Sequence, residues 1–249
     1  MLKTNATWER RNFGCDAYEF KLDTNDCANV TSTITEMNLA DMDNCFVTVK
    51  MPVGQIKMLH ALESSGFNFM ENQFRITRSL KNYQSPDLIK RLGAGCTQQE
   101  VSKTPSQWRA VADMLTDNIF TTDRVYLDPL LPSGTSAIRY KNWIMDLLDN
   151  PAAHLFLYYK DGVAIGFSLA LYKDGYVDDL LAGVFEAFLS SGYGFLLFDA
   201  ALKNYASLGF TKIETSISSN NFSIMKLYQF FDYEIISQHY VLRKYKGVK

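Results

Sequence analysis

The stretch that decides the fold is Ala182-Gly183-Val184-Phe185-Glu186-Ala187-Phe188-Leu189-Ser190-Ser191-Gly192-Tyr193-Gly194. It begins as an apolar strand, passes through small residues, and runs straight into an apolar helix expected over 193–207. The first turn of a helix leaves its N–H groups unpaired and favours negative charge, and glycine lets an anion approach the backbone closely. The stretch therefore predicts an anion-binding loop between a strand and a helix, with a plain turn as the alternative.

Three kinds of phosphate-binding loop are compatible with small residues before a helix. A Walker loop is excluded because it ends in Gly-Lys-Ser/Thr, which is absent here. A dinucleotide-binding loop would place a third small residue where the chain has Leu197, although Glu214 does follow at about the distance of a ribose-binding acid. The preceding strands are also joined by short turns, whereas a dinucleotide-binding unit needs helical crossovers. Coenzyme A remains, because its pyrophosphate suits such a loop.

The sequence on both sides of this stretch predicts an α+β fold. Three strands expected over 154–159, 163–172 and 177–185 are joined by short turns and are therefore antiparallel. A strand at 212–217, a helix at 221–231 and two short strands at 233–236 and 240–244 follow the helix at 193–207. Upstream, a strand is expected at 88–94 and helices at 106–119 and 137–148. The pattern predicts a mainly antiparallel sheet flanked by helices, with one strand–helix–strand crossover near its end.

The first third of the chain has its own alternation of elements. It contains expected strands at 18–22, 44–50 and 67–76 and a helix at 53–64. The polar segment 81–87, with Pro86, is the best candidate for a linker. We therefore expect a small N-terminal α/β domain over 1–84 and a larger domain over 85–249.

Composition excludes several classes of protein. The 249 residues are 47% hydrophobic, and 25 basic against 27 acidic residues give a net charge of −2, so no basic field is available for nucleic acid. The four cysteines form no C-x-x-C pair and the three histidines are scattered, which argues against a zinc site or a disulfide framework. No apolar run of about 18 residues predicts a membrane span, and no signal-like stretch opens the chain. The expected setting is the cytoplasm.

Two motifs resemble those of the GCN5-related N-acetyltransferases. Val184, Leu189, Gly192 and Gly194 are similar to that family's Val-x-Pro-x-x-Arg/Gln-x-x-Gly-x-Gly/Ala. Asn221, Ile224 and Tyr228 are similar to its Asn-x-x-Ala-x-x-x-Tyr. The departures are Glu186 in place of proline, Leu189 in place of the basic or amide residue, and Ile224 in place of the small residue. The resemblance covers about 88–245.

The whole chain also resembles the dTDP-fucosamine acetyltransferases, which act on amino-sugar nucleotides. This resemblance rests on Trp8-Glu9, Phe13-Gly14, the run 62–67 and Tyr140-x-x-Trp143-Ile144.

The resemblance implies splayed central strands and a binding site for acetyl-CoA between them. In such folds the fourth strand, here near 178–185, parts from the fifth, near 212–217. The pantetheine arm would pair with the backbone of Gly183, Val184 and Phe185, and Asn221 would touch it. The pyrophosphate would lie on the amides of Leu189, Ser190, Ser191, Gly192, Tyr193 and Gly194. Tyr228 is the candidate general acid for the departing thiolate, because an unperturbed tyrosine, with a pKa of about 10, stays protonated at neutral pH. A homodimer is expected only because the resembled enzymes form one.

The acceptor side is less determined by the sequence. In the loop 121–129, Arg124 is predicted to hold a nucleotide's phosphates, with Tyr126 stacking on a base or sugar and Asp128 beside them. A surface ion pair of Arg124 with a neighbouring aspartate is the alternative. Asp178, Asp179 and Glu186 are candidate bases, or solvated edge charges.

Together these features predict an acetyl-CoA-dependent N-acetyltransferase for the amine of a small molecule, with a nucleotide-linked amino sugar as the first expectation. Two alternatives remain open. One is transfer to an amino acid, a polyamine or a protein N-terminus. The other is a catalytically silent module that only binds coenzyme A.

Overall fold

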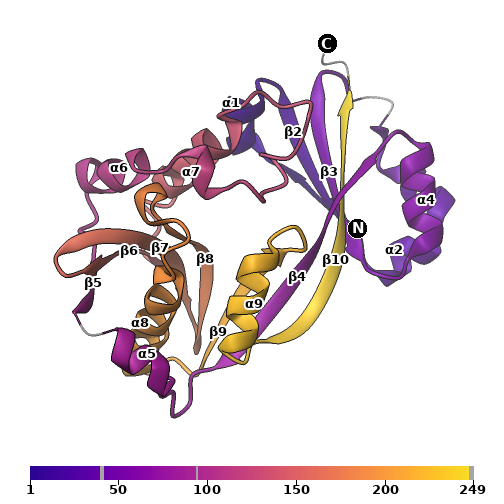
Figure 1. Cartoon of the computed structure of the whole chain (residues 1–249). Helices are drawn as coiled ribbons and strands as arrows, with labels where there is room; N and C mark the ends of the chain where they lie inside the picture. Colours follow the sequence, from indigo (N-terminus) through magenta and orange to yellow (C-terminus); the bar gives the residue numbers. More distant parts are fainter. Residues whose placement is uncertain (40–41, 94, 247–249) are drawn as a thin grey trace.

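The computed structural model describes residues 1–39, 42–93 and 95–246, and one twisted sheet runs through these ranges (Figure 1). Its ten strands have the order β1-β2-β3-β10-β4-β9-β8-β7-β6-β5. They are β1 (Leu2–Asn5), β2 (Asp16–Lys21), β3 (Cys45–Pro52), β4 (Asn68–Ser79), β5 (Cys96–Glu100), β6 (Ala153–Lys160), β7 (Val163–Lys173), β8 (Tyr176–Val184), β9 (Lys212–Ser218) and β10 (Glu234–Lys246). Most neighbours are antiparallel, and only the β2–β3 and β8–β9 pairs are parallel.

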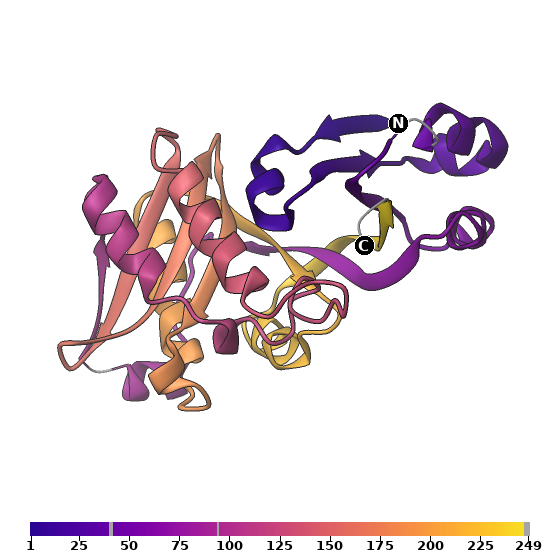
Figure 2. The ribbon, with the colours of Figure 1, turned by 90° about the horizontal axis from the view of Figure 1, so that it is seen from above.

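Helices cover both faces of this sheet (Figure 2). They are α1 (Arg10–Phe13), α2 (Thr24–Ala28), α3 (Val30–Glu36), α4 (Ile56–Ser64), α5 (Asp87–Leu92), α6 (Pro105–Asp113), α7 (Thr135–Asp146), α8 (Tyr193–Ser207) and α9 (Phe222–Phe230), with 3₁₀ turns η1 (Thr7–Glu9), η3 (Asp117–Ile119) and η4 (Glu186–Phe188). Because side chains alternate along a strand, β6 separates two cores. Phe156 and Tyr158 join the core under α5, α8 and α9, whereas Leu155 joins the core under α6 and α7.

The central strands part as expected. Tyr176–Asp179 of β8 pair with Lys212–Thr215 of β9, and the two strands share no pair beyond that point. A β-bulge lies at the point of separation. Leu181 pairs with Leu169 of β7 and Asp179 with Ala170, which leaves Leu180 as an extra residue on β8. Such a bulge bends its strand and increases the local twist, so it turns the rest of β8 away from β9.

Three sequence expectations are corrected by the structure. The strand expected at 88–94 is helix α5, and Ala94 lies outside the described residues. Pro86 precedes this helix, Asp87 opens it, and Lys90 with Arg91 lie in its last turn, so its charges match the helix dipole. The helix expected at 106–119 ends at Asp113, and the short strands expected at 233–236 and 240–244 are the single strand β10, with a bulge near Ile236.

The sheet is continuous across the boundary expected at 84/85. Strand β4, which precedes that boundary, lies between β10 and β9, which follow it. The division into domains 1–84 and 85–249 therefore stays a prediction about folding units. It does not correspond to a break in the sheet. Among the described residues, none of the helices has the length and apolar character needed to cross a bilayer.

Candidate functional site

A cleft of about 960 Å³ opens where β8 and β9 separate. One wall is formed by the gap between the strands, the loop that follows β8, and α9. The other wall is formed by the loop at 118–125, by α7, and by the N-terminal residues between Ala6 and Glu19. Of the site residues expected from the sequence, the cleft gathers Gly183, Val184, Leu189, Ser190, Ser191, Gly192, Tyr193, Gly194, Asn221, Tyr228 and Arg124. Phe185, Tyr126 and Asp128 are not among its lining residues.

The loop between β8 and α8 presents alternate backbone amides to the cleft. Ser190 and Gly192 both have positive φ values, 63° and 82°, and Gly192 is the N-cap of α8. The N–H groups of Leu189, Ser191 and Tyr193 are used within the loop, where they donate to Glu186 O, Phe188 O and Ser191 Oγ. Those of Ser190, Gly192 and Gly194 have no acceptor among the described residues. We call these three N–H groups the amide cradle; at the start of a helix they are suited to an anion.

The free edge of β8 differs from the sequence expectation in its details. The N–H of Phe185 donates to Ile165 O at 2.9 Å, and the Phe185 ring is buried beneath α6 and α7. The backbone N–H and C=O groups of successive residues point to opposite sides of a strand. Those of Gly183 therefore also point toward β7, while those of Val184 and Ala182 point into the gap. The expected pairing of a ligand with Gly183 and Phe185 is therefore corrected to Val184 and Ala182. Gly183 serves instead as a close-packing point, since a Cβ there would lie 3.1 Å from Ile119.

Helix α9 brings two expected residues to the gap. Asn221 caps the helix, and its Oδ1 accepts the N–H of Ile224 at 3.3 Å, which leaves its amide N–H groups available to the cleft. Tyr228 lies almost two turns further on. Its ring packs edge-on against Phe198 and Tyr233, and burial raises the pKa of its hydroxyl above the ordinary value. Tyr228 therefore stays protonated throughout the physiological range.

Asp179 is the buried carboxylate at the point where the strands part. It is only 7% exposed, and its Oδ1 has no hydrogen-bond partner. Burial, followed by the charge of Asp178, raises its pKa to about 7. Its partner in the β8–β9 register is Thr215, which also forms a hydrogen bond with Tyr228. A carboxylate that titrates near neutrality beside a protonated tyrosine is a typical functional arrangement.

The other two candidate bases have structural partners. Asp178 accepts a hydrogen bond from Arg75 at 2.8 Å, and Arg75 also bonds to Glu214 at 3.0 Å. Glu186 is on the surface of η4, where hydrogen bonds from Thr116 and Asn118 lower the pKa of its carboxyl group. Only Asp179 of the three is both buried in the cleft and without a cation beside it.

The loop 121–129 separates the three residues expected to hold an acceptor. Arg124 lines the cleft, and its Nη1 donates to the buried carboxylate of Glu71 at 3.0 Å. Tyr126 is exposed outside the cleft. Asp128 is buried, and its two oxygens accept from Nη2 and Nε of Arg243 at 2.7 and 2.6 Å. The expectation that Asp128 binds an acceptor is corrected: both of its oxygens are held in a bidentate ion pair that fixes the loop to β10.

Replacing Asp128 by Ala is expected to lower the free energy of unfolding by about 3–5 kcal/mol, because it leaves a buried guanidinium without its counterion. Urea unfolding followed by circular dichroism measures the change. The double variant Asp128→Leu/Arg243→Met removes both charges and is expected to lose much less. A double variant as unstable as the single one would contradict this account of the pair.

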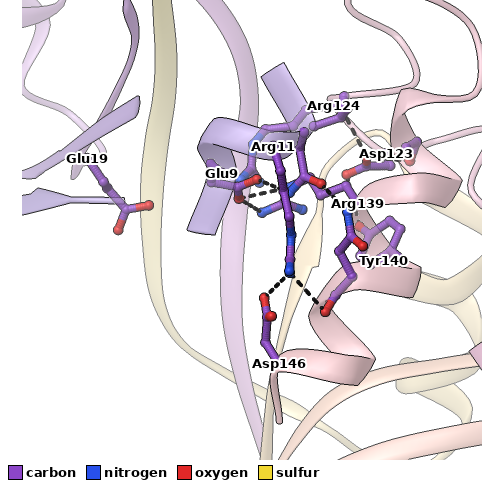
Figure 3. Close-up of polar contacts among 12 residues, drawn as sticks. Glu9, Arg11, Glu19, Asp123, Arg124, Arg139, Tyr140 and Asp146 are labelled. Atoms are coloured by element: carbon purple, nitrogen blue, oxygen red, sulfur yellow. Dashed lines mark hydrogen bonds and ion pairs between the residues drawn. The ribbon is translucent and has the colours of Figure 1, made fainter. Parts of the chain in front are cut away.

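The N-terminal segment forms a cleft wall that the sequence did not reveal. Figure 3 shows Glu9 and Arg139 paired, with Arg11 reaching Asp146 at the other end of α7. Arg139 Nε lies 2.8 Å from Glu9 Oε1. These residues are about 130 positions apart, and no local pattern pairs them. Their contacts hold η1 and α1 against α7. Residues of the N-terminal segment, which lies between β1 and β2, therefore line the same cleft as residues of α7.

Comparison with known proteins identifies the fold. No family model and no curated protein matches the sequence. Among solved structures, a GCN5-related N-acetyltransferase from Kribbella flavida is 15% identical, with a TM-score of 0.56, over 92% of this chain and 81% of that one. A tandem protein of the same fold from the clavulanic acid biosynthesis pathway is 12% identical, with a TM-score of 0.55, over 89% and 70%. A functionally unknown conserved protein from Staphylococcus epidermidis is 13% identical, with a TM-score of 0.58, over 93% and 84%.

The chain therefore has the fold of the GCN5-related N-acetyltransferases, and the expected α+β class with splayed central strands is confirmed. The narrower resemblance to amino-sugar nucleotide acetyltransferases gains no support from these structures and stays a prediction, as does a homodimer. Within the described residues, no group of three or more histidine, cysteine or acidic side chains is placed to hold a metal ion.

Proposed function

We propose that this chain is an acetyl-CoA-dependent N-acetyltransferase that acts on the amine of a small molecule. The observation that carries the proposal is the presence of the amide cradle, the open edge of β8 and the Tyr228–Asp179 pair in one cleft. Backbone amides at the start of α8 suit a pyrophosphate. The unpaired edge of β8 suits an extended amide-containing arm, which can add to it like a strand.

The donor would lie along the gap, with its pyrophosphate on the amide cradle and its pantetheine arm beside Ala182 and Val184. Leu189 replaces the basic or amide residue of the family motif, so the cradle relies on backbone N–H groups and the helix dipole. The amide of Asn221 faces the same gap and is suited to a hydrogen bond with the arm. Because the arm would run from the amide cradle back along β8, the thioester would lie beyond Ala182, toward the point where the strands part.

Two side chains would handle the protons of the reaction. The amine nitrogen bonds to the thioester carbon, the carbon–sulfur bond breaks, and the electron pair leaves on sulfur. Tyr228 would protonate that sulfur. Asp179, with a pKa raised to about 7, would take the proton that the amine loses, through water. Both side chains line the gap where β8 and β9 part. The acceptor would enter from the opposite side, between α7 and the N-terminal segment.

For the acceptor we propose a nucleotide-linked amino sugar, with other small amines as the tested alternatives. The cleft of about 960 Å³ extends past the strand gap to a second wall, so it offers space for an acceptor beside the donor. The wall formed by the loop at 118–125, α7 and the N-terminal residues combines aromatic rings, among them Trp8 and Tyr140, with charged groups such as Arg124. This mixture suits a ligand with flat, polar and charged parts.

The test of donor binding uses two glycines at opposite ends of α8. Gly192 and Gly209 have nearly equal positive φ values, 82° and 87°, and a Cβ added at either would meet no atom within 4 Å. Replacing either by Leu therefore costs comparable backbone strain, but only Gly192→Leu places a side chain at the amide cradle. Calorimetry is expected to show acetyl-CoA binding weakened at least about tenfold by Gly192→Leu, since charge-assisted hydrogen bonds are lost. Equal weakening by Gly209→Leu would remove the cradle from the proposal.

The reaction itself is tested by the release of free thiol from acetyl-CoA in the presence of a panel of amines. The panel holds nucleotide-linked amino sugars, free amino sugars, amino acids and polyamines. Release that depends on one class of amine, with the acetylated product identified by mass spectrometry, supports the proposal and names the acceptor. Tight binding of acetyl-CoA without release for any amine would instead favour a silent coenzyme A-binding module.

A further inference from the structure

Away from the strand gap, one face of the sheet carries a row of residues from Lys21 to Glu71 that is charged except at Val241. Lys21 of β2 pairs with Lys50 of β3, Lys50 with Val241 of β10, and Val241 with Glu71 of β4. Residues that pair directly across strands point to the same face of a sheet. Neighbouring strands lie about 4.8 Å apart, so Lys50 and Glu71 are separated by about 10 Å across the sheet. Arg124 reaches down from its loop onto Glu71.

The cations at this site outnumber the carboxylates that pair with them directly. Glu19 is shared, because its carboxylate lies 3.3 Å from Lys50 Nζ and 4.0 Å from Lys21 Nζ. Glu71 is 2% exposed and neutralises Arg124. Three cations therefore have two carboxylates among them.

Two further charged groups lie nearby. Arg139 is paired with Glu9. The oxygens of Asp123 accept hydrogen bonds from Tyr140, Ser136 and the backbone of Val125, so Asp123 faces its own loop and α7. Its charge still acts on Arg124, where it adds to the effect of Glu71 in raising the pKa of the guanidinium. Figure 3 shows Glu19 on its strand, apart from the paired residues on the α7 side.

Burial first, and positive neighbours second, lower the pKa of two groups at this site. Burial, and then the charge of Arg124, lowers the pKa of the Lys50 ammonium below its usual value, although Glu19 lies beside it. Burial, followed by Lys50 and Lys21, lowers the pKa of His239 on β10.

The two cations nearest the interior remain accessible from the cleft. Lys50 and Arg124 line it, with 17% and 20% of their side chains exposed. Arg124 uses Nη1 for Glu71, and its other N–H groups have no acceptor among the described residues. Glu71 thus fixes the guanidinium through one nitrogen and leaves other donors of a cleft-lining arginine for an oxyanion, a group that arginine binds well.

We propose that Lys50 and Arg124 form an anion subsite that binds a phosphate or carboxylate group of the acceptor, at the end of the cleft away from the strand gap. This inference rests on the proposed function for the identity of the ligand as an acceptor. The acceptor is then an amine that also carries an anionic group. Glu71 orients Arg124 and is a positioning residue for the subsite, whereas Glu19 competes with the anion for Lys50.

The remaining basic residues on the acceptor side do not offer an equivalent site. Arg75 is held by both Asp178 and Glu214, and Arg139 bonds to Glu9 through Nε and Nη2. Arg243 is buried under Asp128 and outside the cleft. Lys50 was not singled out by the sequence, because its relation to Arg124 depends on strand register.

The experiment measures anion binding directly, with saturating coenzyme A present so that the amide cradle is occupied. Calorimetric titrations use pyrophosphate and malonate as the phosphate and carboxylate probes. Lys50→Met keeps the length of the side chain and removes its charge; Lys57→Met, on the exposed surface of α4, is the matched control. Glu19→Gln removes the carboxylate that competes for Lys50, so it tests the opposite sign.

We expect Lys50→Met to weaken binding of the favoured probe at least about tenfold, Lys57→Met to leave it unchanged, and Glu19→Gln to tighten it. The favoured probe tells whether the acceptor's anion is a phosphate or a carboxylate. Binding of neither probe, or binding that Lys50→Met and Glu19→Gln leave unchanged, would overturn the subsite. Thermal unfolding of each variant shows that it is folded, and the opposite effects of the two substitutions cannot come from a general loss of structure.

The same titrations separate this inference from the proposed function. A Lys50-dependent anion site in a protein that releases no thiol would retain the subsite and overturn the acetyltransferase. If amines that carry no anionic group support thiol release, at equal rates in the wild type and Lys50→Met, the proposed acetyltransferase activity would stand and the subsite would be overturned.

Discussion

Replacing Tyr228 by Phe is expected to lower the turnover number for acetyl transfer by about 10²- to 10⁴-fold, the usual contribution of a positioned proton donor. Burial keeps the hydroxyl protonated, and Tyr228 lines the gap in which the thiolate would form. Acetyl-CoA binding should change little, since the amide cradle and the edge of β8 are untouched. Steady-state kinetics, together with calorimetry of acetyl-CoA, measures the two quantities.

The neighbouring tyrosine provides the control. Tyr233 packs its ring 4.7 Å from that of Tyr228, and its hydroxyl is buried without a partner and does not line the cleft. Tyr233→Phe removes the same atom from the same core, so any loss that comes only from repacking appears in both variants. A turnover number that falls equally in the two variants, or in neither, would remove Tyr228 as the acid.

The local part of the site could be predicted from the sequence. A strand, small residues and a helix follow one another within 182–194, so the same short stretch supplies the free edge, the loop and the amides. Asn221 and Tyr228 are seven residues apart on one helix, which places both on one face. The prediction failed for Phe185 because the side on which a strand's polar groups point depends on its neighbour β7 and on the bulge at Leu180.

The acceptor side could not be predicted because its residues meet only through long-range contacts. Arg124 finds Glu71, Asp128 finds Arg243, and Arg139 finds Glu9. Each pair joins segments that are separated by more than 50 positions, and in a single sequence nothing distinguishes the buried Asp128 from an exposed loop aspartate. The row from Lys21 to Glu71 crosses four strands whose order, β2-β3-β10-β4, is not their order in the chain.

Replacing Asp179 by Asn is expected to make the protein less active and more stable at pH 8. The carboxyl group has a pKa near 3.9 in an unfolded chain and about 7 in the folded one. Between these values the folded state holds a proton that the unfolded state has lost, so the free energy of unfolding falls as the pH rises. A difference of about three pH units corresponds to at most about 4 kcal/mol at pH 8. Asparagine carries no charge at any pH and is free of this cost.

The measurement is a series of urea unfolding curves from pH 4.5 to pH 8.5 for the wild type and Asp179→Asn. The two proteins should be close in stability near pH 4.5, where Asp179 is protonated, and should diverge as the pH rises through 7. Asp178→Asn is the matched control on the next residue. It takes from Arg75 one of two carboxylates, so it is expected to destabilise. Because the charge of Asp178 is the smaller cause of the raised pKa of Asp179, Asp178→Asn should reduce the fall in stability between pH 4.5 and pH 8.5 only in part, whereas Asp179→Asn should abolish it.

The kinetic consequence of the same ionisation has the opposite direction. If Asp179 accepts the proton of the amine, only its charged form is active, and the turnover number of the wild type should rise with an apparent pKa near 7. Asp179→Asn should lose that rise together with most of the activity. The ionisation of Asp179 would then both lower the stability of the protein and allow the side chain to accept a proton. A variant that gains stability at pH 8 but keeps the wild-type pH profile would show that Asp179 is only a buried acid, and that water alone removes the proton.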